Sequence, residues 1–147
     1  MKVQESIIIR AEAAKIWPFL IEPVHIKKWC LPVIKIDRTS EQKSGPGTTF
    51  YFEERAAWQL LKMNFVVSEW IEHRSLAFKL TSGNFVKSYE QRYTLENTNT
   101  GLKVNCYEDV TLPLGILGKF AGIFRGPVTR AHLKRNLAAI KIMAETV

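Results

Sequence analysis

Four polar side chains share one predicted face of two neighbouring strands near the end of the chain. Residues 85–96 and 102–112 alternate apolar and polar side chains, and side chains two positions apart in a strand lie on one face. If Tyr93 faces the interior, Tyr89 and Gln91 face it too, and Glu108 shares the inner face of the partner strand with Val104. A few polar groups on an apolar wall are typical of a ligand cavity. In the plainer alternative, the hydroxyls reach solvent at the ends of the sheet and Glu108 lies at the rim.

Glu108 is also the one candidate for acid–base catalysis. A carboxyl group in that role needs a raised pKa and a positioned partner. Tyr89, Arg92 and His132 are the partners to consider, but their sequence positions do not fix their distances from Glu108. The sequence therefore assigns no residue a catalytic role outright.

The sequence contains no motif typical of a metal site or of a cofactor-binding site. The histidines His25, His73 and His132 are scattered, and their spacing matches no metal site. Cys30 and Cys106 lie 76 positions apart without a CxxC pair, so we expect free thiols, with Cys106 buried in a strand. A glycine-rich nucleotide-binding loop is lacking as well, and we expect neither a metal nor a cofactor.

Length and composition predict one globular domain over residues 1–147. Hydrophobic residues make up 46% of the chain and charged residues 24%, the balance of a folded protein. The first residues lack the basic and apolar pattern of a signal peptide, and no apolar run is long enough to span a membrane. We therefore expect a cytoplasmic protein.

The net charge of +7 is concentrated in the last third of the chain. Residues 111–144 contain six lysines or arginines and no acidic residue. These cations could keep one face of a helix in solvent, attract an anionic head group or contact an anionic membrane. Nucleic acid is not expected, because the aromatic residues follow strand periodicity and are not interleaved with basic ones.

The elements that must position these residues follow from the hydrophobic periodicity. Residues 3–10 are expected to form a strand, and a helix follows within 11–21, where Pro18 forces either a late start near Lys15 or a kink. A second short helix covers 24–29. Strands are then expected at 33–38, 48–55, 58–70, 75–81, 85–96 and 102–112, with a hairpin turn at 97–101.

A long final helix opens at Gly126 and Pro127. Leu133, Leu137, Ile140, Ala144 and Val147 form one apolar stripe along it. Seven strands present an apolar face too large for one helix to cover. The sequence therefore predicts an α+β fold in which a strongly curved antiparallel sheet of about seven strands wraps around the C-terminal helix and leaves space between them.

Several short segments, in this order, resemble the START / polyketide-cyclase (SRPBCC) superfamily. They are Ser6–Ala11, Ile16–Leu20, Trp29, Gly45–Thr48 and Val67–Trp70, followed by the predicted hairpin and the long final helix. The resemblance covers essentially the whole chain and implies a helix-grip fold with a cavity between sheet and helix. Members of the superfamily bind lipids, sterols, polyketides, plant hormones or quinones, and some catalyse cyclisation or dehydration.

We expect this protein to carry or sense a hydrophobic small molecule in such a cavity. The residues expected to bind the ligand are Phe50, Phe52, Phe65, Phe78, Tyr89, Gln91, Tyr93, Glu108, Leu117, Phe120 and Leu137. Two alternatives stay open. One is a cyclase or dehydratase that uses acid–base residues of the cavity, and the other is an interaction module resembling the chaperone-activator branch, which would have a filled core.

The glycine-spaced apolar stretch 114–124 precedes the final helix. We expect it to pack over the mouth of the cavity, and its glycines could make it a gate. In another interpretation, residues 114–135 touch an anionic membrane transiently during ligand exchange. The sequence fits either a monomer or a homodimer.

Overall fold

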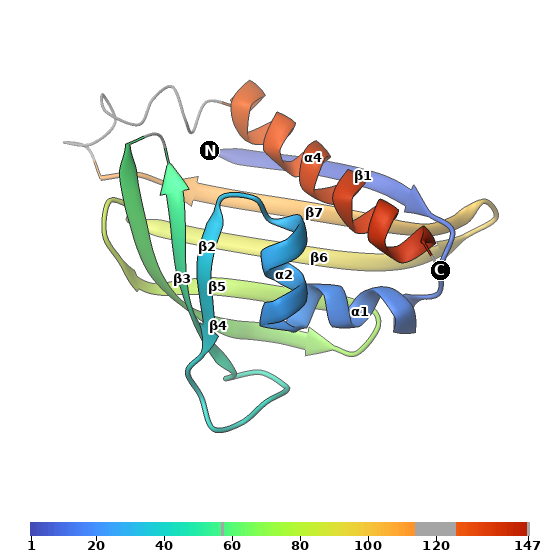
Figure 1. Cartoon of the computed structure of the whole chain (residues 1–147), viewed down its shortest axis with the longest axis horizontal. Helices are drawn as coiled ribbons and strands as arrows, with labels where there is room; N and C mark the ends of the chain where they lie inside the picture. The colour runs from blue at the N-terminus through green and yellow to red at the C-terminus, as the bar shows by residue number, and fades with distance from the viewer. Residues whose placement is uncertain (57, 114–125, 147) are drawn as a thin grey trace.

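The structure is a computed structural model that describes residues 1–56, 58–113 and 126–146. Within these residues the chain forms seven strands and three helices (Figure 1). In chain order they are β1 (Lys2–Ile9), α1 (Ala13–Ile21), α2 (Pro23–Trp29), β2 (Val33–Arg38), β3 (Thr49–Ala56), β4 (Gln59–Ile71), β5 (Ser75–Gly83), β6 (Ser88–Thr98), β7 (Gly101–Thr111) and α4 (Gly126–Glu145).

The strands form one antiparallel sheet in the order β1-β7-β6-β5-β4-β3-β2. Strands β2 to β6 each pair with the next one along the chain, while β1 pairs with β7. Because β1 and β2 lie at opposite edges of the sheet, α1 and α2 connect one edge with the other (Figure 1). The predicted α+β class and the seven-stranded antiparallel sheet are confirmed.

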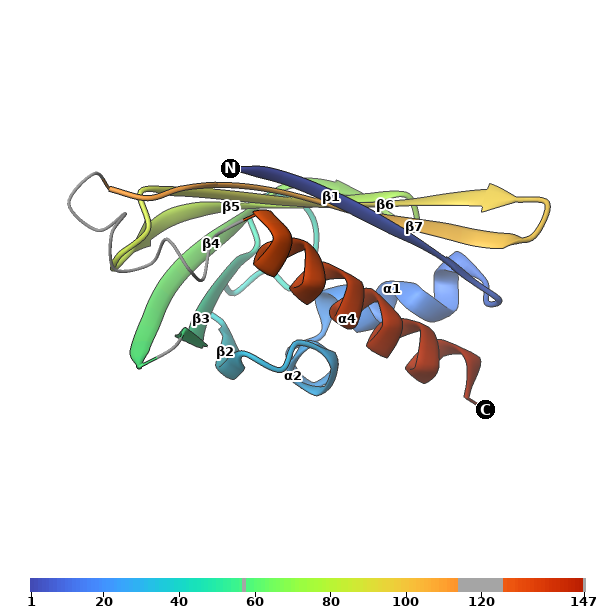
Figure 2. The same cartoon turned by 90° about the horizontal axis from the view of Figure 1, so that it is seen from above.

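The sheet curves strongly, and its irregular pairings account for part of this shape. The β4–β5 register shifts twice, between Asn64 and Phe65 and between Val67 and Glu69. A bulge of this kind bends its strand and increases the local twist. In Figure 2 the half of the sheet formed by β2, β3 and β4 turns away from the plane of β1, β7 and β6, and α4 crosses the concave side.

The predicted hairpin joins β6 to β7, with Thr98 opposite Gly101. Gly101 has a φ of +142°, a conformation that other residues rarely adopt. A Cβ atom there would also lie 2.9 Å from the backbone oxygen of Ile9. Glycine therefore lets the turn approach the end of β1.

Helix α1 does not follow the first of its two predicted alternatives, a late start. It begins at Ala13, not near Lys15, and continues through Pro18. Proline supplies no N–H to the helix, but Ile16, Trp17 and Leu20 are buried in the core. Burial of this apolar face stabilises the helix in spite of the missing hydrogen bond.

The apolar stripe of α4 is confirmed in the described residues. Leu133, Leu137, Ile140 and Ala144 are each at most 2% exposed. Val147, the last residue assigned to the stripe, lies outside the described residues. The stripe holds α4 against the concave face of the sheet, where the cavity lies.

Candidate functional site

A cavity of about 350 Å³ opens between the sheet, α2 and the first half of α4. This volume is at the lower end of the range of about 300–1,000 Å³ that small-molecule sites occupy. Its wall consists of Leu20, Ile26, Trp29, Cys30, Pro32, Phe52, Glu54, Arg55, Ala56, Leu61, Met63, Phe65, Phe78, Val86, Tyr89, Gln91, Tyr93, Glu108, Val128, Thr129, His132, Leu133 and Asn136.

The structure places most of the expected ligand-binding residues on this wall. Phe52, Phe65, Phe78, Tyr89, Gln91, Tyr93 and Glu108 all line the cavity. Two others do not, since Phe50 and Leu137 are buried in the core behind it. Phe50 packs edge-to-face against Phe52 and Phe78, with ring centroids 6.3 and 5.9 Å apart. Leu117 and Phe120, like the whole stretch 114–124 expected to cover the mouth, lie outside the described residues.

Aromatic side chains form a continuous part of the wall. The ring of Phe65 meets those of Phe52 and Tyr89 edge-on, each with centroids 5.4 Å apart. Across the cavity, Trp29 contacts Tyr93 at 6.3 Å, and its indole Nε1 donates a hydrogen bond of 2.7 Å to the Phe19 backbone oxygen. These contacts fix the rings, so the wall presents a preformed apolar surface.

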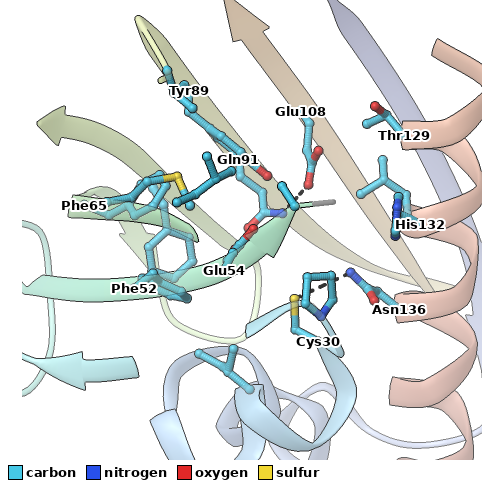
Figure 3. A pocket seen from close by; sticks show the side chains of 18 of the residues that line it. Cys30, Phe52, Glu54, Phe65, Tyr89, Gln91, Glu108, Thr129, His132 and Asn136 are labelled. Atoms are coloured by element: carbon cyan, nitrogen blue, oxygen red, sulfur yellow. Dashed lines mark hydrogen bonds between the residues drawn. The ribbon is translucent and has the colours of Figure 1, made fainter. Parts of the chain in front are cut away.

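Glu108 points into the cavity from β7 and is 7% exposed. Gln91 lies opposite it on β6, and the Gln91 Nε2 donates a hydrogen bond of 2.6 Å to Glu108 Oε1 (Figure 3). Burial raises the pKa of Glu108 because it disfavours the charged form, and hydrogen bonds from Tyr89 and Gln91 oppose that rise. Glu108 is therefore a restrained, buried carboxyl group.

The three residues considered as partners of Glu108 lie in different places relative to it. Tyr89 interacts with it, but Arg92 belongs to the other face of β6 and pairs with Glu69, so the suggestion of Arg92 is wrong. His132 lines the cavity from α4, where its Nδ1 lies 2.7 Å from an Arg135 side-chain nitrogen. Burial and the Arg135 charge lower the pKa of His132, so its neutral form predominates at pH 7.

Glu54 is a second carboxyl group in the cavity, and it was not among the residues expected to bind the ligand. It is half-buried on β3 and lines the cavity. Burial, followed by the nearby Glu108 charge, raises the pKa of Glu54 to about 7. The signal was present in the sequence, since the period of two that places Phe52 on the inner face of its strand also places Glu54 there. At neutral pH this group can either donate or accept a proton.

Cys30 and Asn136 complete the polar part of the wall. The Asn136 Nδ2 donates to Cys30 Sγ at 3.8 Å, while Asn136 Oδ1 is buried without a hydrogen-bond partner. Burial also raises the pKa of the Cys30 thiol, which is therefore uncharged at neutral pH. In Figure 3, Glu54, Glu108 and Asn136 extend into the cavity from β3, β7 and α4.

The cysteine prediction is confirmed. Cys30 and Cys106 are both free, and Cys106 is buried in β7 opposite Tyr93. In the described ranges, no three of the His, Cys, Asp and Glu side chains gather in a way that could hold a metal ion. The polar groups that line the cavity are carboxyl, amide, phenol, imidazole, thiol, hydroxyl and guanidinium groups.

Part of the positive charge of the last third pairs within the fold. Arg130 Nη1 lies 2.8 Å from Glu5, and Lys141 Nζ lies 2.9 Å from Glu145. Lys134 and Arg135 are exposed beside the buried stripe of α4. The structure thus gives several of these cations roles in tying the helix to β1 and in solvating its outer face.

Comparison with known families identifies the chain. The family described as "Polyketide cyclase / dehydrase and lipid transport" matches residues 1–142. The chain belongs to this family. Membership in the polyketide cyclase / dehydrase and lipid transport family confirms the resemblance drawn from the short segments, and the curved sheet with its C-terminal helix is the helix-grip fold.

Solved structures share this fold at low sequence identity. The START superfamily protein from Mycobacterium smegmatis has a TM-score of 0.78 and 14% identity over 98% of this chain and 97% of that one. TTHA0849 from Thermus thermophilus has a TM-score of 0.77 and 14% identity over 99% and 100%. The Zhui aromatase/cyclase from Streptomyces sp. R1128 has a TM-score of 0.71 and 14% identity over 99% and 93%.

No curated protein sequence matches the chain. Among the helices of the described ranges, none combines the length and the apolar character needed to cross a membrane. Since fold alone does not define activity, the function must be argued from the cavity itself.

Proposed function

We propose that the protein binds a hydrophobic small molecule in the cavity between its sheet and α4, as a carrier or sensor. One observation carries the proposal: a volume of about 350 Å³ with an aromatic wall and a small group of converging polar side chains. The apolar wall supplies affinity, and the polar side chains orient one end of the ligand. The family description, which includes lipid transport, supports the same class of ligand.

Burial of apolar surface supplies most of the binding free energy in this proposal. A ligand that buries about 300 Å² of apolar surface gains about 7.5 kcal/mol at about 25 cal/mol per Å². Loss of translational and rotational freedom offsets part of this gain. The fixed aromatic rings limit further losses, because they need little reordering when a ligand enters.

Native mass spectrometry of freshly purified protein, followed by organic extraction, tests the proposal directly. We expect a co-purified lipid or aromatic compound, or, in delipidated protein, uptake of the uncharged dye Nile red. Filling the cavity with Thr129→Phe from α4 should weaken dye binding at least about fivefold, since an added ring occupies the space of the ligand.

Ala138→Phe is the matched control for that variant. Ala138 lies on the opposite, exposed face of α4, so the same ring there leaves the cavity unchanged. Ala56→Phe fills the cavity from β3 and covers the case in which Thr129→Phe fails to fold. Equal dye binding by wild type and by both folded cavity-filling variants would contradict the proposal.

Acid–base catalysis is the second candidate function, and Glu54 favours it. A carboxyl group with a pKa of about 7 can transfer protons at neutral pH, and Glu108 adds a second carboxyl group in the same cavity. A cyclase or dehydratase should lose about a hundredfold or more in turnover on Glu54→Gln or Glu108→Gln while still binding substrate. A carrier should change only its affinity.

An interaction module with a filled core is less consistent with the cavity volume. Transient membrane contact through residues 114–135 stays a prediction, because 114–125 lie outside the described residues. The cytoplasmic location, the expected lack of a cofactor and the choice between monomer and homodimer also stay predictions.

A further inference from the structure

The polar side chains of the cavity are rich in hydrogen-bond acceptors that lack a donor. Asn136 is 8% exposed and lines the cavity, and its Oδ1 has no partner. No side chain of the described residues donates a hydrogen bond to Glu54. A buried acceptor without a partner costs about 1–3 kcal/mol, so an occupant with donors would be favoured.

Three polar side chains on the same wall already use their donors within the protein. Gln91 Nε2 donates to Glu108, and Thr129 Oγ1 donates to the Met1 sulfur at 3.9 Å. The Tyr93 hydroxyl interacts with the Cys106 thiol. Among these groups an incoming ligand meets free acceptors and engaged donors, the reverse of what a carboxylate or phosphate group requires. No described residue engages the guanidinium donors of Arg55, but they lie at the exposed border of the cavity.

The charges of the cavity wall also disfavour an anionic ligand. Glu54 and Glu108 are close enough to repel each other when ionised. Arg55 borders the cavity, but its side chain is exposed and forms no ion pair with the described carboxylates. His132 is held in its neutral form. The described wall therefore carries two carboxyl groups without a facing cation, and a buried carboxylate is stable only when it is paired.

We propose that the occupant is a hydrophobic amine whose protonated nitrogen lies among Glu54, Glu108 and Asn136 Oδ1. This inference rests on the proposed function and names the class of its ligand. A primary ammonium group has three N–H donors, whereas a hydroxyl group has one. It would satisfy the acceptor of Asn136 and neutralise the carboxyl pair, and the aromatic rings of Tyr89 and Trp29 line the same cavity.

Three probes with one aromatic body separate the amine from other polar ends. Naphthylethylamine, naphthylethanol and naphthylacetate are titrated into delipidated full-length protein at pH 7 by isothermal calorimetry. We expect the amine to bind at least about tenfold more tightly than the alcohol, and the carboxylate to bind most weakly, because the acceptors favour donors and the carboxyl pair repels an anion.

Variants identify the groups responsible. Glu54→Gln should weaken amine binding about tenfold and leave alcohol binding within about twofold. Asn136→Leu, of similar volume, should weaken amine binding about threefold. Glu53→Gln is the matched control, because Glu53 accepts a hydrogen bond from Tyr51 and does not line the cavity. Glu53→Gln should leave the affinity for the amine and for the alcohol unchanged.

The outcomes separate this inference from the proposed function. Tighter binding of the amine that is lost in Glu54→Gln supports the inference. Equal or tighter binding of the alcohol or the carboxylate overturns it, while the proposed function of hydrophobic binding survives. If no probe binds, the inference is also overturned, and the proposed function then depends on the extraction and dye experiments.

Discussion

The two halves of α4 face different surroundings on the same concave surface. The second half contributes Leu137, Ile140 and Ala144 to a core in which each is at most 2% exposed. The part of the helix up to its middle, at Asn136, places Thr129 and Asn136 at the cavity, both buried and both polar. One helix therefore closes the interior at one end and leaves a lined space at the other.

The contrast shows how the fold allows a cavity without losing its core. At the filled end, α4 packs against apolar side chains such as Ile9 and Ile16, and dispersion and burial stabilise the contact. At the other end the sheet curves away, and side chains from the strands and the helix no longer meet. Buried polar groups are tolerated there because a ligand or water can satisfy them.

Ile140→Ala should have the largest effect, since it removes a fully buried side chain from the filled end. We expect the free energy of unfolding to fall by about 2–5 kcal/mol, measured by urea denaturation. Val128→Ala at the cavity end should cost less than about 1 kcal/mol, because Val128 is 36% exposed and borders existing space. Equal losses at the two positions would break the comparison.

Glu54→Gln should stabilise the ligand-free protein at neutral and higher pH. The pKa of Glu54 is raised to about 7, so the folded state disfavours its charged form. As the pH rises from the unfolded-state value to the folded-state value, the folded protein binds more protons than the unfolded chain, and wild-type stability falls. The variant, which cannot ionise there, should be more stable by about 1–3 kcal/mol at about pH 8.

The pH profile provides the control for this prediction. At about pH 4, where Glu54 is protonated in both states, the advantage of the variant should nearly vanish. Thermal denaturation at several pH values measures it, with Glu53→Gln as the control that lies away from the cavity. A stability difference that does not vary between these pH values would contradict the burial of an ionisable Glu54.

Lys141→Gln should have the smallest effect on stability, because Lys141 lies at the edge of the filled end of the interior. Lys141 Nζ donates to the Ile8 backbone oxygen at 2.7 Å and lies 2.9 Å from Glu145 Oε1, which also accepts from the Arg10 backbone N–H. We expect the melting temperature to drop by about 2 °C, and less in high salt. Lys134→Gln, at an exposed position, should leave it unchanged. A drop larger than that for Ile140→Ala would reverse the ranking.

The elements of the fold were predictable because each has a local cause. Period-two alternation marked the strands to within a few residues, and the predicted turn at 97–101 joins β6 to β7. The start of α1 was not predictable from Pro18, because packing of Trp17 and Leu20 outweighs the local cost of proline. Tertiary burial decided that boundary.

The cavity wall was predictable only within the strands whose inner faces were considered. Tyr89, Gln91 and Glu108 followed from alternation, and Glu54 could have been found in the same way. Cys30 and Asn136 carried no such signal, because their meeting depends on how the end of α2 approaches α4. Phe50 was placed on the correct face, but the curvature set it behind the wall.

The sequence by itself determined the order of elements, the inward face of each strand and the apolar stripe of α4, since these depend on neighbours along the chain. Only the tertiary structure decided where the helix and the sheet separate, and therefore which inward side chains are packed and which line the cavity. The raised pKa of Glu54 belongs to this second group, because it arises from burial and from a carboxyl group on a strand distant in sequence.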